Sequence, residues 1–492
     1  GPAGEAQNYT HSVKKLDLEG LKDFRDRFDI PISDTELEKV PYYRPPEDST
    51  EMRYLKQRRS SLGGSLPRRK SDFEALQIPP LSVLESVLKG TGDRQISTTM
   101  AFVRILSTLI KDKQIGERIV PIVPDEARTF GMEGMFRQLG IYSSGGQLYE
   151  PTDTDQIMYY REDKKGQVLA EGINEGGAFA AWLAAATSYS NNETPLIPFY
   201  VFYSMFGFQR IGDLCWAAGD LQARGFLLGG TSGRTTLNGE GLQHQDGHSH
   251  ILASTVPNCV SYDPAYAYEL AVIIRQGLQE MYVEKLPRYY YITIMNENYE
   301  QPAIPDGVEQ GILRGMYCLQ KNAVKSSKKV VQLLGSGTIL RESIAAAELL
   351  QRDFGVIADI WSVTSFNELR REGLSVHRWN MLHPQEKPRL SYVEECLTGV
   401  SGPVIAATDY MKAYADQIRG FVPGLYSVLG TDGFGRSDTR ERLRKFFEVD
   451  RYYITVAALS ALAQKNVIDA AQVTKAIELY GIDPGKPDPV TL

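Results

Sequence analysis

The sequence contains few cysteines, and their spacing excludes two classes of small domain. Its 492 residues include only four, Cys215, Cys259, Cys318 and Cys396, which lie far apart and form no CxxC pair. This spacing argues against a disulfide scaffold or a structural zinc site, and it fits a protein of the reducing cytoplasm. We therefore expect each cysteine to be a buried small hydrophobic residue.

Long apolar runs and an excess of basic residues are also missing. No apolar run approaches the roughly 18 residues needed to span a bilayer, so we expect no membrane partner. The formal net charge of -7 gives no reason to expect nucleic acid as a partner. With 42% hydrophobic and 23% charged residues, the chain has the composition of a globular protein.

Two common catalytic motifs are absent. The glycine-rich run from Gly229 to Gly241 lacks the GxxxxGK[ST] order of a phosphate-binding P-loop, and no strand–GxGxxG–helix unit occurs. Tight turns account for these glycines. The chain also has no GxSxG elbow, which excludes the Ser-His-Asp arrangement of the α/β-hydrolases.

The pattern of the chain predicts three regions. Residues 1–78 are polar and contain prolines and basic runs, including Lys56 to Ser61, so we expect a loop, a short helix from Leu18 to Phe28 and an extended, solvated linker. Residues 79–305 and 306–492 each alternate between apolar strands and helices.

Continuous apolar strands between helices are typical of a parallel sheet that is covered on both faces. The sequence therefore predicts an α/β protein with two parallel-sheet domains preceded by a linker. The expected strands are Arg118–Val123, Leu196–Tyr203, Phe226–Leu228, Cys259–Tyr262, Tyr289–Ile294, Val330–Leu334, Val356–Val363 and Val404–Ala407. The expected helices are Ala127–Leu139, Asn174–Ser190, Ala265–Tyr282, Ile344–Gln351, Tyr410–Ile418 and Tyr453–Gln464.

One carboxylate is placed unusually. Glu175 stands where the helix after Gly172 should begin, and small or apolar residues follow it as far as Trp182. Burial would raise the pKa of such a group and a helix N-terminus would lower it. A carboxylate held between these influences suits proton transfer to a bound heterocycle, although it could also only complement the helix dipole.

A histidine-rich loop, residues 241–250, follows the aromatic stretch Phe199 to Phe208. His244, Asp246, His248 and His250 are spaced like a metal-binding cluster. A loop flanked by glycines could equally place one histidine at a pocket and leave the others exposed. We favour the second interpretation and expect no metal ligands here.

Several longer segments resemble one enzyme family. Residues 125–134, 172–175, 203–219, 229–250 and 430–437 are similar to the homodimeric, acetyl-transferring pyruvate dehydrogenases of bacterial 2-oxo acid dehydrogenase complexes. The resemblance covers the chain after Gly1-Pro2 but only about the C-terminal half of such a protein. It implies a pyrimidine-binding domain followed by a transketolase-type C-terminal domain.

The resemblance also implies roles for individual residues around thiamine diphosphate. Glu175 would hydrogen-bond the aminopyrimidine ring of the cofactor and shift it to the imino tautomer. Tyr203 and Phe206 would form the aromatic wall around that ring. Asp125 and Glu126 would lie near the cofactor.

Two histidines are implied as catalytic by the same resemblance. His244 would face the bound substrate and stabilise carboxylate or enolate charge. His11 lies in Thr10-His11-Ser12-Val13-Lys14-Lys15, which resembles a mobile active-site loop, although a surface-loop histidine is an equally good interpretation.

One departure from the family is large. Members bind the diphosphate and Mg²⁺ through a GDG motif that is followed by an asparagine, and this chain contains no GDG. The chain begins Gly1-Pro2, a dipeptide that tag removal leaves behind. We therefore expect a C-terminal fragment that carries only the pyrimidine side of the cofactor site and is inactive alone.

The resemblance implies that the parent protein is bacterial and cytoplasmic. It would decarboxylate pyruvate and reductively acetylate a lipoyl group on the partner acetyltransferase, working as a homodimer. Two alternatives remain. One is another thiamine enzyme, such as a transketolase or a 2-oxoglutarate dehydrogenase, and the other is a non-catalytic dimerisation or interaction module.

Overall fold

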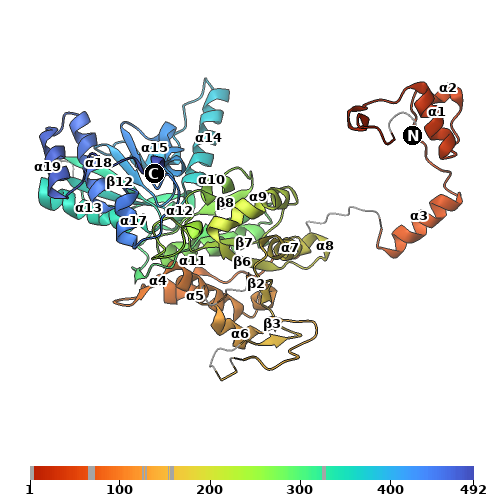
Figure 1. The fold of residues 1–492 in the computed structure, drawn as a ribbon, viewed down its shortest axis with the longest axis horizontal. Coiled ribbons are helices and arrows are strands. Elements are labelled where there is room, and N and C mark those ends of the chain that lie inside the picture. The colour runs from red at the N-terminus through yellow and green to blue at the C-terminus, as the bar shows by residue number, and fades with distance from the viewer. Residues whose placement is uncertain are drawn as a thin grey trace. The chain divides into compact units, whose positions relative to one another are not determined.

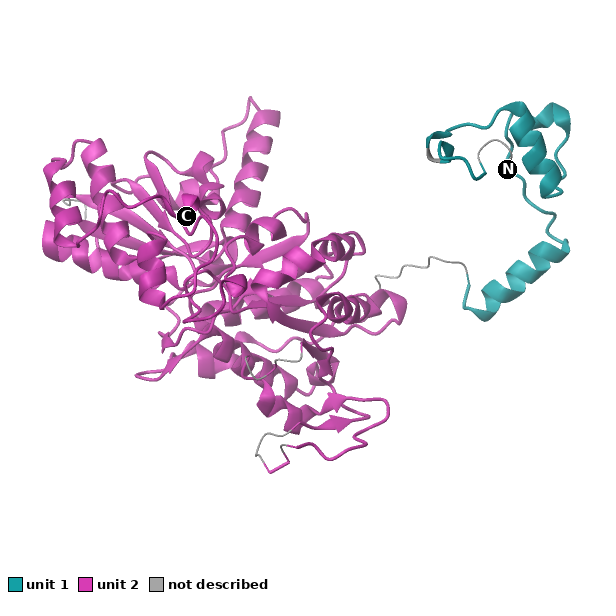
Figure 2. Cartoon of the chain, viewed as in Figure 1, with its two compact units in different colours: residues 1–69 teal, residues 70–492 magenta. Residues whose placement is uncertain are grey.

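The chain forms two compact units, residues 1–69 and 70–492 (Figure 2). The computed structural model describes residues 5–64, 73–124, 127, 130–152, 154–155, 160–323 and 328–492. The domain boundaries that the sequence suggests at residues 78 and 305 remain a proposal. No helix in these ranges is both long enough and apolar enough to cross a membrane.

The first unit is more helical than the sequence suggested. It contains helices α1 (Leu18–Arg27), α2 (Asp34–Leu37) and α3 (Thr50–Ser61). The prediction that the basic run at Lys56 to Ser61 belongs to an extended linker is wrong, because this run forms the second half of α3. Ser49 caps that helix by accepting a hydrogen bond from the backbone amide of Met52.

A six-stranded parallel sheet forms the first half of the second unit (Figure 1). The strand order is β5-β2-β6-β7-β9-β8, and every neighbouring pair is parallel. The predicted parallel α/β architecture is therefore confirmed here. The bounds are β2 (Ile119–Val123), β5 (Leu169–Ala170), β6 (Ile197–Tyr203), β7 (Phe226–Gly230), β8 (Cys259–Tyr262) and β9 (Tyr289–Thr293).

Alternate residues of these strands enter two different apolar cores. On β9, Tyr289 and Tyr291 pack into one core, while Tyr290 and Ile292 pack into the other. Because successive side chains of a strand point to opposite faces, a strand buried on both faces is apolar throughout. The first core includes buried residues of α7 (Glu175–Ala186) and α9 (Ser204–Asp220), and the second those of α5 (Thr98–Ile110) and α11 (Ala267–Tyr282).

The second sheet has five strands in the order β11-β13-β12-β14-β15. Four of them run parallel, as predicted, but the edge strand β11 is antiparallel to β13. The bounds are β11 (Met316–Gln320), β12 (Val330–Gly335), β13 (Ile357–Val363), β14 (Val404–Ala407) and β15 (Tyr426–Leu429).

The remaining elements cover these sheets or connect them. The helices are α4 (Glu85–Leu88), α6 (Glu133–Leu139), α8 (Ser188–Asn191), α10 (Ser249–Ala253), α12 (Glu309–Arg314), α13 (Ile339–Phe354), α14 (Phe366–Leu382), α15 (Tyr392–Leu397), α16 (Lys412–Asp416), α17 (Arg440–Phe446), α18 (Arg451–Gln464) and α19 (Ala471–Leu479). Two short ladders pair β1 (Gln95–Ile96) with β10 (Tyr299–Glu300) and β3 (Ile141–Tyr142) with β4 (Glu162–Asp163).

Several predicted helices differ in extent from those in the structure. The helix expected to begin at Ala127 begins at Glu133, and the one expected over Tyr410–Ile418 covers only Lys412–Asp416. The helix expected over Asn174–Ser190 is divided at Thr187 into α7 and α8.

The four cysteines are free thiols, as expected, but only two of them are fully buried. Cys215 and Cys259 lie in the core, whereas Cys318 and Cys396 are partly exposed. Burial raises the pKa of all four thiols. Protonated thiols are poor nucleophiles, so none has the character of a reactive cysteine.

A buried ion network joins the two sheet regions. The guanidinium group of Arg444 on α17 donates to Glu297, which follows β9, and to Glu342 on α13. Its Nε atom also donates to the Thr235 hydroxyl, at 3.3 Å. All three charged side chains are at least 89% buried.

Removing the arginine from this network should destabilise the fold. We expect Arg444→Met to lower the free energy of unfolding by about 3–5 kcal/mol, because two buried carboxylates would lose a cationic partner. Urea unfolding followed by circular dichroism measures this change. Arg442→Met is the matched control, since Arg442 is exposed and its ion pair with Asp438 is long at 4.0 Å and therefore weak. Equal stability of the two variants would contradict the role of the network.

Two further buried carboxyl groups lie where the sheets meet. Asp263, which follows β8, accepts a hydrogen bond from the Thr293 hydroxyl at 2.8 Å. Asp409, which follows β14, accepts one from the Thr235 hydroxyl at 2.8 Å. Burial, with the nearby Glu269 charge, raises the pKa of Asp263 to about 7. Burial, with the Asp263 charge, raises the pKa of Asp409 to about 7.

These raised pKa values predict how stability depends on pH. The folded state holds protons on Asp263 and Asp409 that the unfolded chain releases near pH 4, so their contribution is complete below pH 4 and is lost as the pH rises to about 7. Asp263→Asn, which mimics the neutral group, should make the decline in unfolding free energy between pH 4 and 7 shallower. The exposed Asp306→Asn should leave the decline unchanged. Denaturant titrations at several pH values test this prediction, and a wild-type slope in D263N would refute it.

Candidate active site

Glu175 is the first residue of α7, as the sequence predicted. The Asn174 side chain caps the helix by accepting a hydrogen bond from the Gly177 amide at 3.0 Å. A Cβ atom on Gly177 would lie 2.6 Å from the Asn174 amide nitrogen, so a side chain there would require the capping amide to shift. The cap therefore fixes the start of the helix and places the Glu175 carboxylate in its first turn.

The Glu175 carboxylate contacts a residue that sequence reasoning missed. Arg210 on α9 donates from Nη1 to Glu175 Oε1 at 2.5 Å, and its guanidinium carbon lies 4.3 Å from the centre of the Phe206 ring. The Glu175 side chain is 16% exposed and that of Arg210 is 49% exposed. Arg210 thus connects the carboxylate of α7 to the aromatic residues of α9. Its spacing of four residues from Phe206 was the available signal, since such pairs share a helix face.

Tyr203, Phe206 and His244 form one cluster of rings. The His244 ring centre lies 5.3 Å from that of Tyr203 and 5.4 Å from that of Phe206. Tyr203 ends β6, Phe206 lies in the first turn of α9, and His244 ends a short 3-10 helix, Leu242–His244. The structure therefore brings together four residues named from the sequence, with Glu175 joined to the other three through Arg210.

A buried tyrosine lies close to this carboxylate. Tyr200 on β6 is fully buried, and its hydroxyl has no hydrogen-bond partner among the described residues. Burial and the charge of Glu175 raise the pKa of Tyr200. The phenol therefore stays neutral near pH 7.

The histidine-rich loop is organised by Asp246. This buried carboxylate accepts hydrogen bonds from the amides of His248 and Ser249 and from the Ser249 hydroxyl. These hydrogen bonds fix the loop where α10 begins. Within the described ranges, no group of three or more histidine, cysteine, aspartate or glutamate side chains could hold a metal ion.

The other two histidines of the loop have partners outside the ring cluster. His250 is fully buried, stacks on Tyr414 at 4.8 Å and forms a hydrogen bond with the Thr293 hydroxyl at 2.9 Å. Burial lowers its pKa to about 4, so it is neutral near pH 7. His248 Nε2 instead lies 2.9 Å from the Gln209 side-chain amide on α9.

Three residues named from the sequence are not joined to the cluster. Asp125 and Glu126 lie outside the described residues. His11 lies in a short 3-10 helix, Thr10–Ser12, of the first compact unit, and its side chain is outside the described part of the chain. Their roles stay predictions.

Two known domain families match this chain. The family described as the pyruvate dehydrogenase E1 component middle domain matches residues 76–302. The family described as the transketolase-like C-terminal domain matches residues 315–450. These ranges contain the six-stranded and the five-stranded sheet, respectively.

Solved transketolase structures share the fold. A transketolase from Leishmania mexicana superposes with a TM-score of 0.60 at 14% identity, covering 91% of this chain and 58% of that one. The Campylobacter jejuni enzyme gives 0.57 at 16% identity, covering 93% and 61%. At these identities the comparison supports the fold alone.

Curated relatives are much closer in sequence. The pyruvate dehydrogenase E1 component of Pseudomonas aeruginosa is 65% identical over 99% of this chain and 55% of its own length. That of Escherichia coli is 57% identical with the same coverage. The chain therefore spans about half the length of the pyruvate dehydrogenase E1 components that it matches, and its residues 76–302 belong to the family of their middle domain.

Proposed function

We propose that this chain provides the pyrimidine-binding side of a thiamine diphosphate-dependent, acetyl-transferring pyruvate dehydrogenase. The observation that carries the proposal is the continuous set of contacts from Glu175 through Arg210 and Phe206 to His244. Relatives of 57–65% identity are named pyruvate dehydrogenase E1 components, which supports the substrate and the reaction.

The residues of the cluster fit one half of the cofactor. A mostly buried carboxylate beside a wall of rings suits a flat, polar heterocycle that needs one strong hydrogen-bond acceptor. Glu175 would hold the aminopyrimidine and exchange a proton with its ring nitrogen, while Tyr203 and Phe206 would pack on the ring. When bound, thiamine diphosphate supplies the carbon nucleophile and the electron sink.

Arg210 and His244 would act beside the cofactor. Arg210, through its pair with Glu175, would position the carboxylate before the cofactor arrives. His244 is partly exposed, and its Nδ1 lies 3.7 Å from Glu240. Its imidazole would donate to developing negative charge on the substrate. Asp125, Glu126 and His11 are proposed to complete the site.

The diphosphate and Mg²⁺ require ligands that this cluster does not contain. Mg²⁺ prefers carboxylate and other oxygen ligands in octahedral geometry. The cluster offers one carboxylate that is already paired with an arginine. We therefore assign the diphosphate and the metal to the part of the protein that corresponds to the remainder of its longer relatives.

The proposed partners follow from the same assignment. Pyruvate would be the substrate, a lipoyl group on the acetyltransferase component of the complex would accept the acetyl unit, and the protein would work as a homodimer. A transketolase or 2-oxoglutarate dehydrogenase activity and a non-catalytic interaction module are the alternatives. A 2-oxoglutarate dehydrogenase would release CO₂ from a different substrate, and a transketolase would release none. A non-catalytic module would show no turnover.

The first prediction concerns Glu175 in the full-length protein. Glu175→Gln keeps a hydrogen-bonding group but cannot carry the proton, so pyruvate turnover should fall by about 10²-fold or more. CO₂ release from pyruvate, with thiamine diphosphate and Mg²⁺ present, measures the effect.

Glu309→Gln is the matched control for this experiment. Glu309 is also a first-turn glutamate, at the start of α12, but it lies outside the ring cluster. Its replacement should leave turnover near the wild-type rate. Near wild-type turnover by E175Q would mean that Glu175 only complements the helix dipole, and equal losses in both variants would indicate a structural effect.

The second prediction concerns the chain by itself. Without the diphosphate and metal ligands it should bind thiamine diphosphate only weakly, with a dissociation constant above about 100 μM, because those charge-assisted contacts dominate the affinity. Isothermal titration calorimetry with and without Mg²⁺ tests this. Micromolar binding that requires Mg²⁺ would contradict the assignment of these ligands to another part of the protein.

A further inference from the structure

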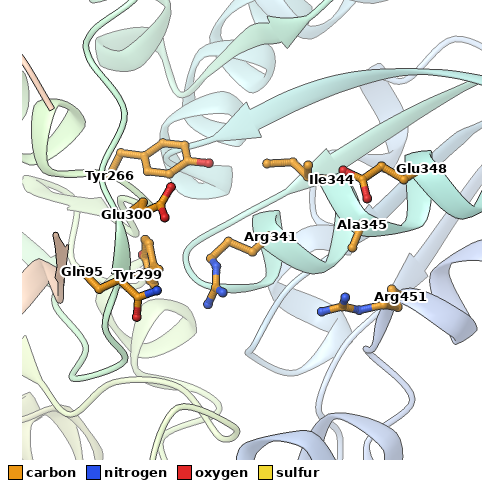
Figure 3. Close-up of a pocket in the computed structure, with 9 residues that line it drawn as sticks. All are labelled: Gln95, Tyr266, Tyr299, Glu300, Arg341, Ile344, Ala345, Glu348 and Arg451. Atoms are coloured by element: carbon orange, nitrogen blue, oxygen red, sulfur yellow. The ribbon is translucent and has the colours of Figure 1, made fainter. Parts of the chain in front are cut away.

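A cleft separates the two sheet regions on a surface that the proposed function does not use. It has a volume of about 360 Å³. Gln95, Tyr266, Tyr299 and Glu300 form the wall nearest the six-stranded sheet, and α13 and the first residue of α18 form the other (Figure 3). It shares no residue with the cluster around Glu175 and His244.

Two arginines of this cleft donate hydrogen bonds to buried carboxylates that lie outside its lining. Arg341 donates to Glu297 at 2.7 Å, and its guanidinium carbon lies 4.6 Å from the centre of the Tyr299 ring. Arg451 donates to Glu342 from Nε at 2.9 Å and from Nη2 at 3.1 Å. Both carboxylates also bind Arg444, which is buried. The cleft arginines are therefore pre-organised.

Each cleft arginine keeps donor capacity for a ligand. A guanidinium carries five N–H donors, and the hydrogen bonds to Glu297 and Glu342 use one donor on Arg341 and two on Arg451. Their side chains are 36% and 44% exposed. Figure 3 shows the Arg451 side chain pointing toward that of Arg341. Such a pair of planar forks suits a carboxylate.

The cleft also contains two carboxylates, whose charge is opposite to that of the arginines. Glu300 on β10 and Glu348 on α13 are exposed, and in the described part of the chain neither forms an ion pair. Figure 3 places both carboxylates in the upper part of the cleft, with the two guanidinium groups in the lower part. A ligand that presents only negative charge would meet these carboxylates, so the charge pattern favours a ligand with both signs.

Apolar atoms lie between the two charged groups. Ile344 and Ala345 stand one turn after Arg341 on the same face of α13, and Glu348 follows one turn later. The rings of Tyr266 and Tyr299 line the opposite wall. A short aliphatic side chain would bury its surface against these residues.

We infer that this cleft is a binding site for a free α-amino acid with an aliphatic side chain. Its carboxylate would bind between Arg341 and Arg451, its ammonium group would face Glu300 or Glu348, and its side chain would contact Ile344 and Ala345. The site lies between the sheets and is separate from the proposed site of catalysis.

Calorimetry with three related probes tests the inference on the chain itself. L-leucine carries both charges, N-acetyl-L-leucine lacks the ammonium group and L-leucinamide lacks the carboxylate. L-leucine should bind at least about tenfold more tightly than either analogue, because each analogue loses one charge-assisted contact. No binding of L-leucine at about 10 mM, where a dissociation constant of about 1 mM would give nearly complete saturation, or equal binding of all three probes, would overturn the inference.

Surface substitutions then locate the site. Glu300→Gln combined with Glu348→Gln should weaken L-leucine binding by about tenfold while leaving N-acetyl-L-leucine binding unchanged or stronger. Both residues are exposed, so the fold should persist, and thermal unfolding checks this. The exposed Glu386→Gln, on the connection after α14, is the control for loss of a surface carboxylate outside the cleft. Wild-type discrimination in the double variant would place leucine elsewhere and refute the site.

Discussion

The guanidinium group of Arg444 lies buried between Glu297, which follows the six-stranded sheet, and Glu342, on a helix of the five-stranded sheet. A buried charge must keep its partners, because an unpaired ion in the interior costs several kcal/mol. The three side chains are therefore satisfied only when the two sheet regions meet in one arrangement. The Thr235 hydroxyl, which also contacts Arg444, ties the glycine-rich loop to the same place.

The proposed catalytic cluster depends on this arrangement and on the parallel sheet. Tyr203 lies at the carboxyl end of β6, and the glycine-rich loop leaves the carboxyl end of the neighbouring strand β7 before reaching His244. In an open parallel sheet, the loops that follow adjacent strands meet at the same edge. The buried Asp246 accepts hydrogen bonds from the amides of His248 and Ser249, which fixes the part of the loop that follows His244. Residues about 40 positions apart in the chain therefore share one surface.

The local pattern of apolar and polar residues predicted much of the fold. It failed where a helix cap or the pairing of distant strands decides the structure. The strands Cys259–Tyr262 and Val404–Ala407 have the predicted bounds, because strands buried on both faces are apolar throughout. The basic composition of Lys56 to Ser61 predicts a solvated linker, yet the Ser49 cap begins a helix that includes this run. The antiparallel direction of β11 could not be predicted, since apolar composition does not encode strand direction.

For the site, the sequence by itself determined that Glu175 begins a helix, because a cap residue and small residues surround it, and its motifs identified the family. It also identified Tyr203, Phe206 and His244 as a set through their resemblance to that family. Only the tertiary structure paired Arg210 with Glu175, directed His250 into the core and left Arg341 and Arg451 in a cleft between the sheets. Such contacts join residues 35 or more positions apart, and they follow from how helices and sheets pack rather than from any local pattern.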